Sequence, residues 1–379
     1  MSAQRVIIIT LLVIGLSSCQ LTRFVVYNFA DITDHKIFPE RELYKATEPF
    51  EFPVAVPNSP PKTLVVDGVE TPFGKFLEDR GTVAFLIIRH DTILYEAYFN
   101  DYEEESVIAS FSMAKSITSL LIGCAIEDGY IQSENEAVIK YVPEMKNDGF
   151  EHVTIKNLLQ MTSGIKFNES YINPFGDAAD FYYGNGLREK TMALKLEGAP
   201  GEVFNYTSGT TQLLGLVLER AMPEGETITS YLQKKLWSPL EMEYNASWSV
   251  DQKSDGLEKT FCCLNARARD FAKIGRLMLH KGVWNDTRLI PEDWIEKSTA
   301  VDTTGGSSWR YQYQWWLASH SGDFYAQGIL GQYIYVNPEA AMVIVRLGEK
   351  TGNVGWKNLF MSLAEAYGKK EYSEDTSQD

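Results

Sequence analysis

Ser112 and Lys115 are the residues whose types and spacing most directly suggest chemistry. They open the stretch "SMAKSITSLLIG", in which apolar residues recur at helical spacing. Residues three apart lie on one face of a helix, so the lysine amine can reach the serine hydroxyl. An amine that burial keeps neutral can take the proton from a serine and activate it without a histidine. The pair therefore predicts a serine nucleophile at the N-terminus of a buried helix.

The same residues also have a plainer interpretation. A serine at this position can simply cap the helix, with the lysine left in solvent. The spacing occurs a second time, at Ser163 and Lys166, in a turn-like stretch. Ninety-odd residues after Ser112, Tyr206-Thr207-Ser208 lies between a Pro-Gly turn and another apolar helix. Tyr206 could be a buried tyrosine whose hydroxyl bonds to the backbone.

Together, four stretches resemble the serine β-lactamase and penicillin-binding-protein superfamily. They are Ser112-x-x-Lys115, "VTIKNLLQMTSGI" at 153–165, Tyr206-x-Ser208 and a glycine on a late strand, and the resemblance covers about residues 65 to 365. It is closer to the class C-like branch, which includes esterases, D-alanyl-peptidases and 6-aminohexanoate-dimer hydrolases. The resemblance implies that Tyr206 is the partner of Lys115 in proton transfer. It also implies a β-lactamase/transpeptidase-like α/β fold, an antiparallel sheet flanked by helices with an inserted all-helical lobe.

The third motif departs from the family pattern. Ala326, Gln327 and Gly328 stand where β-lactamases carry Lys-Thr-Gly, and we take them as candidate substrate-binding residues. The resemblance implies that the N–H groups of Ile329 and Ser112 form the oxyanion hole, because glycine permits close backbone approach. Alanine cannot make the charge-assisted contact by which the family's lysine helps to hold a substrate carboxylate. This change counts against penicillin hydrolysis and favours an ester or amide substrate without that carboxylate.

Aromatic and acidic residues gather between the first two motifs, in "NESYINPFGDAADFYYGNG". Aromatic walls suit an apolar substrate, and a carboxylate among them could pair with a substrate ammonium group. Tyr171, Asp180 and Tyr183 are the candidate substrate-binding residues of this stretch. The alternative is a surface loop that packs on itself.

Composition argues against several other classes of function. Lys and Arg total 35 against 51 for Asp and Glu, a net charge of -16 that repels polyanions, so we expect no nucleic-acid partner. The five histidines show no zinc-site spacing, and we expect neither a metal nor a cofactor. Cys262 and Cys263 fall in a stretch, "KTFCCLNARARDFAKIGRLML", that we interpret as helical and partly buried. We expect small buried thiols there, with a vicinal disulfide as the geometrically awkward alternative.

The N-terminus combines a positive charge, a short apolar run and small residues before a cysteine. Arg5 precedes eleven mostly apolar residues, too few to span a bilayer, and "LSSC" ends at Cys19. This resembles a bacterial lipoprotein signal, so we expect removal of residues 1–18 and attachment of membrane lipid to Cys19. The enzyme would then be anchored in the cell envelope, on the outer membrane or cell surface, with its soluble domain in the periplasm or outside. An ordinary secretory signal or an uncleaved anchor is the alternative.

The order of the elements predicts how the domain is assembled. Repeated prolines predict an extended segment at residues 19–60 that wraps the core. Two β-rich runs around residues 89–91 predict a hairpin, and later runs between 311 and 348 predict further strands. Short helices and long loops occupy a lobe at about 134–258, and a helix at 356–367 precedes an acidic tail at 370–379. Residues 61–369 would thus form one hydrolase domain whose α/β part is completed by both ends of the chain.

These residues predict a serine hydrolase that cleaves a small-molecule ester or amide through an acyl-enzyme on Ser112. Lys115 and Tyr206 would act as general base and acid. The alternatives are a β-lactamase or D-alanyl-D-alanine carboxypeptidase, a penicillin-binding or cell-wall-sensing lipoprotein that acylates once without turnover, and a non-catalytic scaffold.

Overall fold

The main sheet joins strands from both ends of the chain. The computed structural model describes residues 29–56, 61, 63–66 and 69–375. Within these residues seven antiparallel strands pair in the order β13-β14-β15-β16-β17-β4-β5, and β17 pairs with β4. Their bounds are Tyr311–Gln312, Trp315–Leu317, Phe324–Gly328, Gln332–Asn337, Met342–Gly348, Thr82–Arg89 and Thr92–Tyr98. The predicted antiparallel sheet and its hairpin are confirmed.

Strand β4 is apolar at nearly every position because helices cover both faces of the sheet. Leu86 and Ile88 belong to the core shared with α10 (Ala268–Leu279). The alternate residues, Phe85 and Ile87, pack with α3 (Phe73–Asp79) and α12 (Trp356–Asp375). Side chains alternate between the faces of a strand, so burial of both faces requires an uninterrupted apolar run. The final helix extends beyond the predicted end at Tyr367 and takes in part of the predicted acidic tail.

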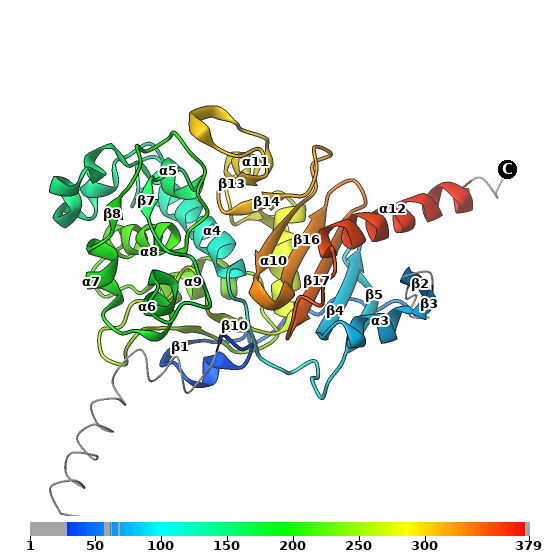
Figure 1. Ribbon diagram of the computed structural model, residues 1–379. Coiled ribbons are helices and arrows are strands. Elements are labelled where there is room, and N and C mark those ends of the chain that lie inside the picture. Colours follow the sequence, from blue (N-terminus) through cyan, green and yellow to red (C-terminus); the bar gives the residue numbers. More distant parts are fainter. Residues whose placement is uncertain (1–28, 57–60, 62, 67–68, 376–379) are drawn as a thin grey trace, which may run out of the picture.

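Helix α4 (Met113–Glu127) lies between the sheet and the helical lobe, and it is buried along nearly its whole length. Figure 1 shows the lobe and the end of the molecule that carries α12 on opposite sides of α4. The lobe contains α5 (Ile155–Leu159), α6 (Asp177–Tyr183), α7 (Leu187–Met192), α8 (Ser208–Ala221) and α9 (Ile228–Leu232). It also contains β7 (Ile165–Lys166), β8 (Lys195–Leu196) and β9 (Ala246–Ser249), so it is not all-helical as predicted.

A second sheet ties the N-terminal segment to the lobe. Its four strands, among the residues described, pair in the order β1-β9-β10-β6, with β1 at Glu40–Leu43, β10 at Leu264–Ala266 and β6 at Ile108–Ala109. The described part of the N-terminal segment therefore includes a strand, along with the short helix η1 (Asp34–Lys36). The prediction of a helix through Cys262 and Cys263 is wrong, because the chain there forms a turn and β10, and α10 begins only at Ala268.

The remaining elements are short. They are β2 (Thr63–Val66), β3 (Val69–Pro72), β11 (Val283–Trp284), β12 (Thr287–Arg288), α11 (Glu292–Thr299), η2 (Val138–Lys140), η3 (Pro143–Asp148), η4 (Phe150–His152), η5 (Gln233–Trp237), η6 (Thr304–Gly306) and η7 (Ile329–Gly331). Within the described ranges, no helix is both long and apolar enough to cross a bilayer.

Candidate active site

Ser112 stands at the tight connection between β6 and α4. The preceding residue, Phe111, has a φ of 44°, a left-handed conformation that is costly for a residue with a Cβ. β10 holds this connection: Ser110 N–H donates to the Leu264 carbonyl at 2.9 Å, and Leu264 N–H donates to Ser110 Oγ at 3.1 Å. Ser112 makes no capping hydrogen bond with its side chain. Its hydroxyl is therefore presented to the site instead of closing the helix.

Lys115 is buried with its amine aimed at Ser112. Its side chain is 1% exposed, and Nζ lies 3.0 Å from Ser112 Oγ, 3.1 Å from Ser208 Oγ and 2.9 Å from the Phe261 carbonyl oxygen. Burial disfavours the charged amine and lowers the pKa of Lys115 to about 8, while the negative charge of Glu169 acts in the opposite direction. An appreciable fraction of this lysine is then neutral near pH 7, as a general base requires.

Tyr206 completes the predicted group of three at the start of α8. Its ring centroid is 5.1 Å from Lys115 Nζ, and the ring packs against Tyr311 and Trp316. Burial raises the pKa of its phenol well above the usual value, although a hydrogen bond with Ser112 lowers it somewhat. Tyr206 therefore stays protonated at neutral pH and suits the role of an acid.

Glu169 is a site residue that sequence reasoning missed. One carboxylate oxygen, Oε2, accepts from Ser208 N–H at 2.7 Å. The other, Oε1, accepts from Ser208 Oγ and from the Tyr171 hydroxyl, both at 2.6 Å. Ser208 was part of the quoted motif, but Glu169 is one of three acids in the stretch before and within α6, and no local pattern distinguishes it from Asp177 and Asp180.

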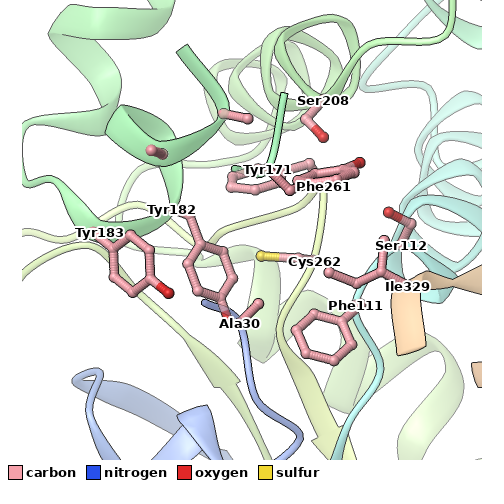
Figure 2. Close-up of a pocket in the computed structure, with 12 residues that line it drawn as sticks. Ala30, Phe111, Ser112, Tyr171, Tyr182, Tyr183, Ser208, Phe261, Cys262 and Ile329 are labelled. Carbon is pink, nitrogen blue, oxygen red and sulfur yellow. The ribbon is translucent and has the colours of Figure 1, made fainter. Parts of the chain in front are cut away.

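A small pocket, partly open to solvent, adjoins Ser112 (Figure 2). Most of its lining is apolar or aromatic, which suits an uncharged group. The described residues that line it are Ala30, Phe111, Ser112, Tyr171, Ala178, Ala179, Tyr182, Tyr183, Ser208, Phe261, Cys262 and Ile329.

The structure places the three candidate substrate-binding residues Tyr171, Asp180 and Tyr183 differently. Tyr171 and Tyr183 line the cavity. Asp180 is absent from the described lining, and its carboxylate instead forms an ion pair with Lys190 at 2.5 Å. An interaction between Asp180 and a substrate ammonium group would require this pair to break.

The end of β15 approaches the nucleophile closely. A Cβ added at Gly328 would lie 2.4 Å from the Ser110 carbonyl oxygen, so this position admits only glycine without displacement of the backbone. Ile329 follows directly and lines the same cavity as Ser112. This proximity supports the assignment of their N–H groups to an oxyanion hole, which stays a prediction. Ala326 is fully buried and Gln327 is half-buried.

Cys262 and Cys263 are joined by a disulfide next to the cavity. The bonded alternative therefore holds in place of the expected thiols, and both residues are buried. The disulfide directly follows Phe261, whose carbonyl accepts from Lys115. Cys124 is a buried free thiol.

The second Ser-x-x-Lys stretch has a different environment. Ser163 Oγ and Thr210 Oγ1 share a hydrogen bond at 2.9 Å, and the side chain of Lys166 is exposed. The Ser163–Thr210 hydrogen bond therefore fixes the first turn of α8. Ser163 and Lys166 do not resemble a nucleophile with its base. In the part of the chain that the structure describes, no group of three or more His, Cys, Asp and Glu residues could hold a metal ion.

The fold, with Ser112, Lys115 and Tyr206 grouped beside one pocket, defines the class of protein as a serine hydrolase. A family model described as Beta-lactamase matches residues 69–367, and the chain belongs to this family. It is 28% identical over 299 residues to the 6-aminohexanoate-dimer hydrolase of Paenarthrobacter ureafaciens, covering 72% of this chain and 73% of that one.

Solved structures show the same relationship. A Bacillus anthracis protein named as a candidate 6-aminohexanoate-dimer hydrolase superposes with a TM-score of 0.78 and 25% identity, covering 89% of this chain and 93% of that one. EstCE1, a hydrolase with promiscuous acyltransferase activity, has a TM-score of 0.60 at 18% identity over 78% of this chain and 96% of its own. The latter likeness supports the fold alone.

Proposed function

We propose that the protein hydrolyses an ester or amide bond through an acyl-enzyme on Ser112. The observation that carries the proposal is the Lys115 amine, which is buried, lies 3.0 Å from Ser112 Oγ, and has its pKa lowered to about 8. A helix cap with a solvated lysine would show neither the burial nor this contact.

Each step of the proposed mechanism uses one of the named groups. Neutral Lys115 takes the proton from Ser112 Oγ, which attacks the substrate carbonyl carbon, and the N–H groups of Ser112 and Ile329 donate to the resulting oxyanion. When the C–O or C–N bond breaks, Tyr206 gives its proton to the leaving group and is reprotonated by the Lys115 ammonium. Water then attacks the acyl-enzyme, its proton passes to Lys115, and the acid product leaves as Ser112 regains a proton.

The proposed substrate class rests on the names of the relatives and on Ala326 in the motif Ala326-Gln327-Gly328. The names of two relatives support hydrolysis of amides, and Ala326 offers no cation for the carboxylate of a penicillin or a D-alanyl peptide. A panel of p-nitrophenyl esters, linear aminohexanoate amides, nitrocefin and D-alanyl-D-alanine peptides tests this class. Turnover of the esters or linear amides supports it. Preferential turnover of nitrocefin or of the peptides would overturn the inference from Ala326, and labelling without turnover would indicate a sensor.

The pH dependence of the reaction should report the lysine. Only neutral Lys115 can accept a proton, so kcat/KM should rise with pH through an acid limb near the pKa of about 8. Near pH 7 about a tenth of the enzyme would be active relative to the plateau. Initial rates with a neutral ester between pH 5.5 and 9.5 check this prediction. A flat profile across this range would contradict a lysine base.

We also propose that the mature protein is a lipoprotein of the cell envelope, attached to membrane lipid through Cys19. The support is the N-terminal sequence, since Cys19 and the signal at 1–18 lie outside the described residues. Fractionation of cells that express the full chain or Cys19→Ser tests it. Equal recovery of both proteins in the membrane fraction would refute attachment through Cys19.

A further inference from the structure

We infer that Glu169 is a positioning residue for acyl transfer, which fixes the orientation of the Lys115 amine through Ser208. The inference rests on the proposed function, because it assigns a role in activating Ser112. It adds a carboxylate to the group formed by Ser112, Lys115 and Tyr206.

Glu169 determines the direction of the hydrogen bonds that Ser208 makes. The Ser208 hydroxyl has one proton, and the Glu169 carboxylate at 2.6 Å can only accept it. Ser208 Oγ must therefore accept from Lys115 Nζ, which lies 3.1 Å away. Because Glu169 also accepts from the N–H group of Ser208, it accepts both hydrogen-bond donors of this residue. Glu169 thus decides which way Ser208 faces.

The same contacts orient the lone pair of the Lys115 amine. A neutral lysine has two N–H donors and one lone pair. Ser208 Oγ and the Phe261 carbonyl oxygen, at 3.1 and 2.9 Å, accept the two donors. The remaining contact, at 3.0 Å, is to Ser112 Oγ. The lone pair is therefore left facing the proton that it must remove.

The negative charge of Glu169 also affects the pKa of Lys115, and this effect can be measured separately from the orientation of the amine. Among the described residues, the titratable groups near the amine are Glu169 from the loop before α6 and Tyr206 before α8, and Tyr171 donates to Glu169. Both tyrosines have raised pKa values, chiefly through burial, which leaves Glu169 as the negative charge that favours the Lys115 ammonium. Loss of that charge should let the amine remain neutral at lower pH.

The test compares kcat/KM against pH for the wild type and Glu169→Gln with a neutral ester. We expect the acid limb to move to lower pH, because the amine loses its neighbouring anion, and the plateau to fall at least tenfold, because the glutamine amide can donate to Ser208 and reverse its orientation. Glu189→Gln, an exposed position on α7, is the charge-matched control and should keep the wild-type profile. An unchanged acid limb or an unchanged plateau in Glu169→Gln would overturn the inference.

Two further variants separate geometry from charge. Ser208→Ala removes the acceptor but keeps the carboxylate, so its plateau should fall while its acid limb stays close to that of the wild type. Tyr171→Phe removes one donor to Glu169 and should also leave the acid limb in place. A wild-type plateau in Ser208→Ala would refute the inference, even if Glu169→Gln failed to fold. Absence of any Ser112-dependent turnover in the wild type would instead refute the proposed function.

Discussion

Replacing Ser112 with alanine is expected to lower kcat/KM by roughly 10⁴-fold or more for every ester and amide that the protein cleaves. The expectation follows because Ser112 Oγ contacts the Lys115 amine and lines the cavity. Without it no acyl-enzyme can form. Initial rates with p-nitrophenyl esters, together with covalent labelling by a fluorophosphonate and intact-protein mass spectrometry, measure the two consequences.

The chain supplies its own control for this substitution. Ser163 has the same Ser-x-x-Lys context, but its hydroxyl bonds to Thr210 away from the lysine base. Ser163→Ala should therefore keep fluorophosphonate labelling and most of the turnover. Equal labelling of wild type and Ser112→Ala would refute the covalent mechanism.

Replacing Lys115 with methionine is expected to lower kcat/KM by about 10³-fold, within the range that a general base contributes. Methionine nearly matches the length and apolar character of the buried stem but cannot take a proton. The variant should also lose the acid limb near pH 8, since that limb reports the amine. Rates across the same pH range and the rate of fluorophosphonate labelling measure both effects.

Lys166→Met is the matched control, because this exposed lysine occupies the equivalent place in the second Ser-x-x-Lys stretch. It should retain the wild-type pH profile. Thermal melts and circular dichroism establish that Lys115→Met is folded. If folded Lys115→Met kept the wild-type rate and its acid limb, another group would have to be the base.

Much of the fold could be predicted because local patterns determine it. The apolar run of β4 and the turn at His90 and Asp91 predict a hairpin, and both turn residues have positive φ. The periodicity after Ser112 predicts α4 as a buried helix. The segment through Cys262 and Cys263 was wrongly predicted as helical, because pairing of β10 with β6 and β9 outweighs its local preference.

The candidate site likewise contains residues that the sequence could predict and residues that it could not. Ser112 and Lys115 are close in sequence, so one helical turn suffices to bring them together. Asp180 was chosen for its carboxylate, and no local signal showed that Lys190 would neutralise it. Glu169 was passed over because its importance depends on Ser208, which lies 39 positions further along the chain.

The sequence by itself determined the candidate nucleophile, the candidate base and the family resemblance, because these depend on residue type and short spacing. Only the tertiary structure decided the state of the base: its burial, its contact with a carbonyl 146 positions away, and the carboxylate that opposes the loss of its charge. The physical reason is that a pKa and the direction of a lone pair are set by the groups that surround an atom, and long-range packing brings those groups there.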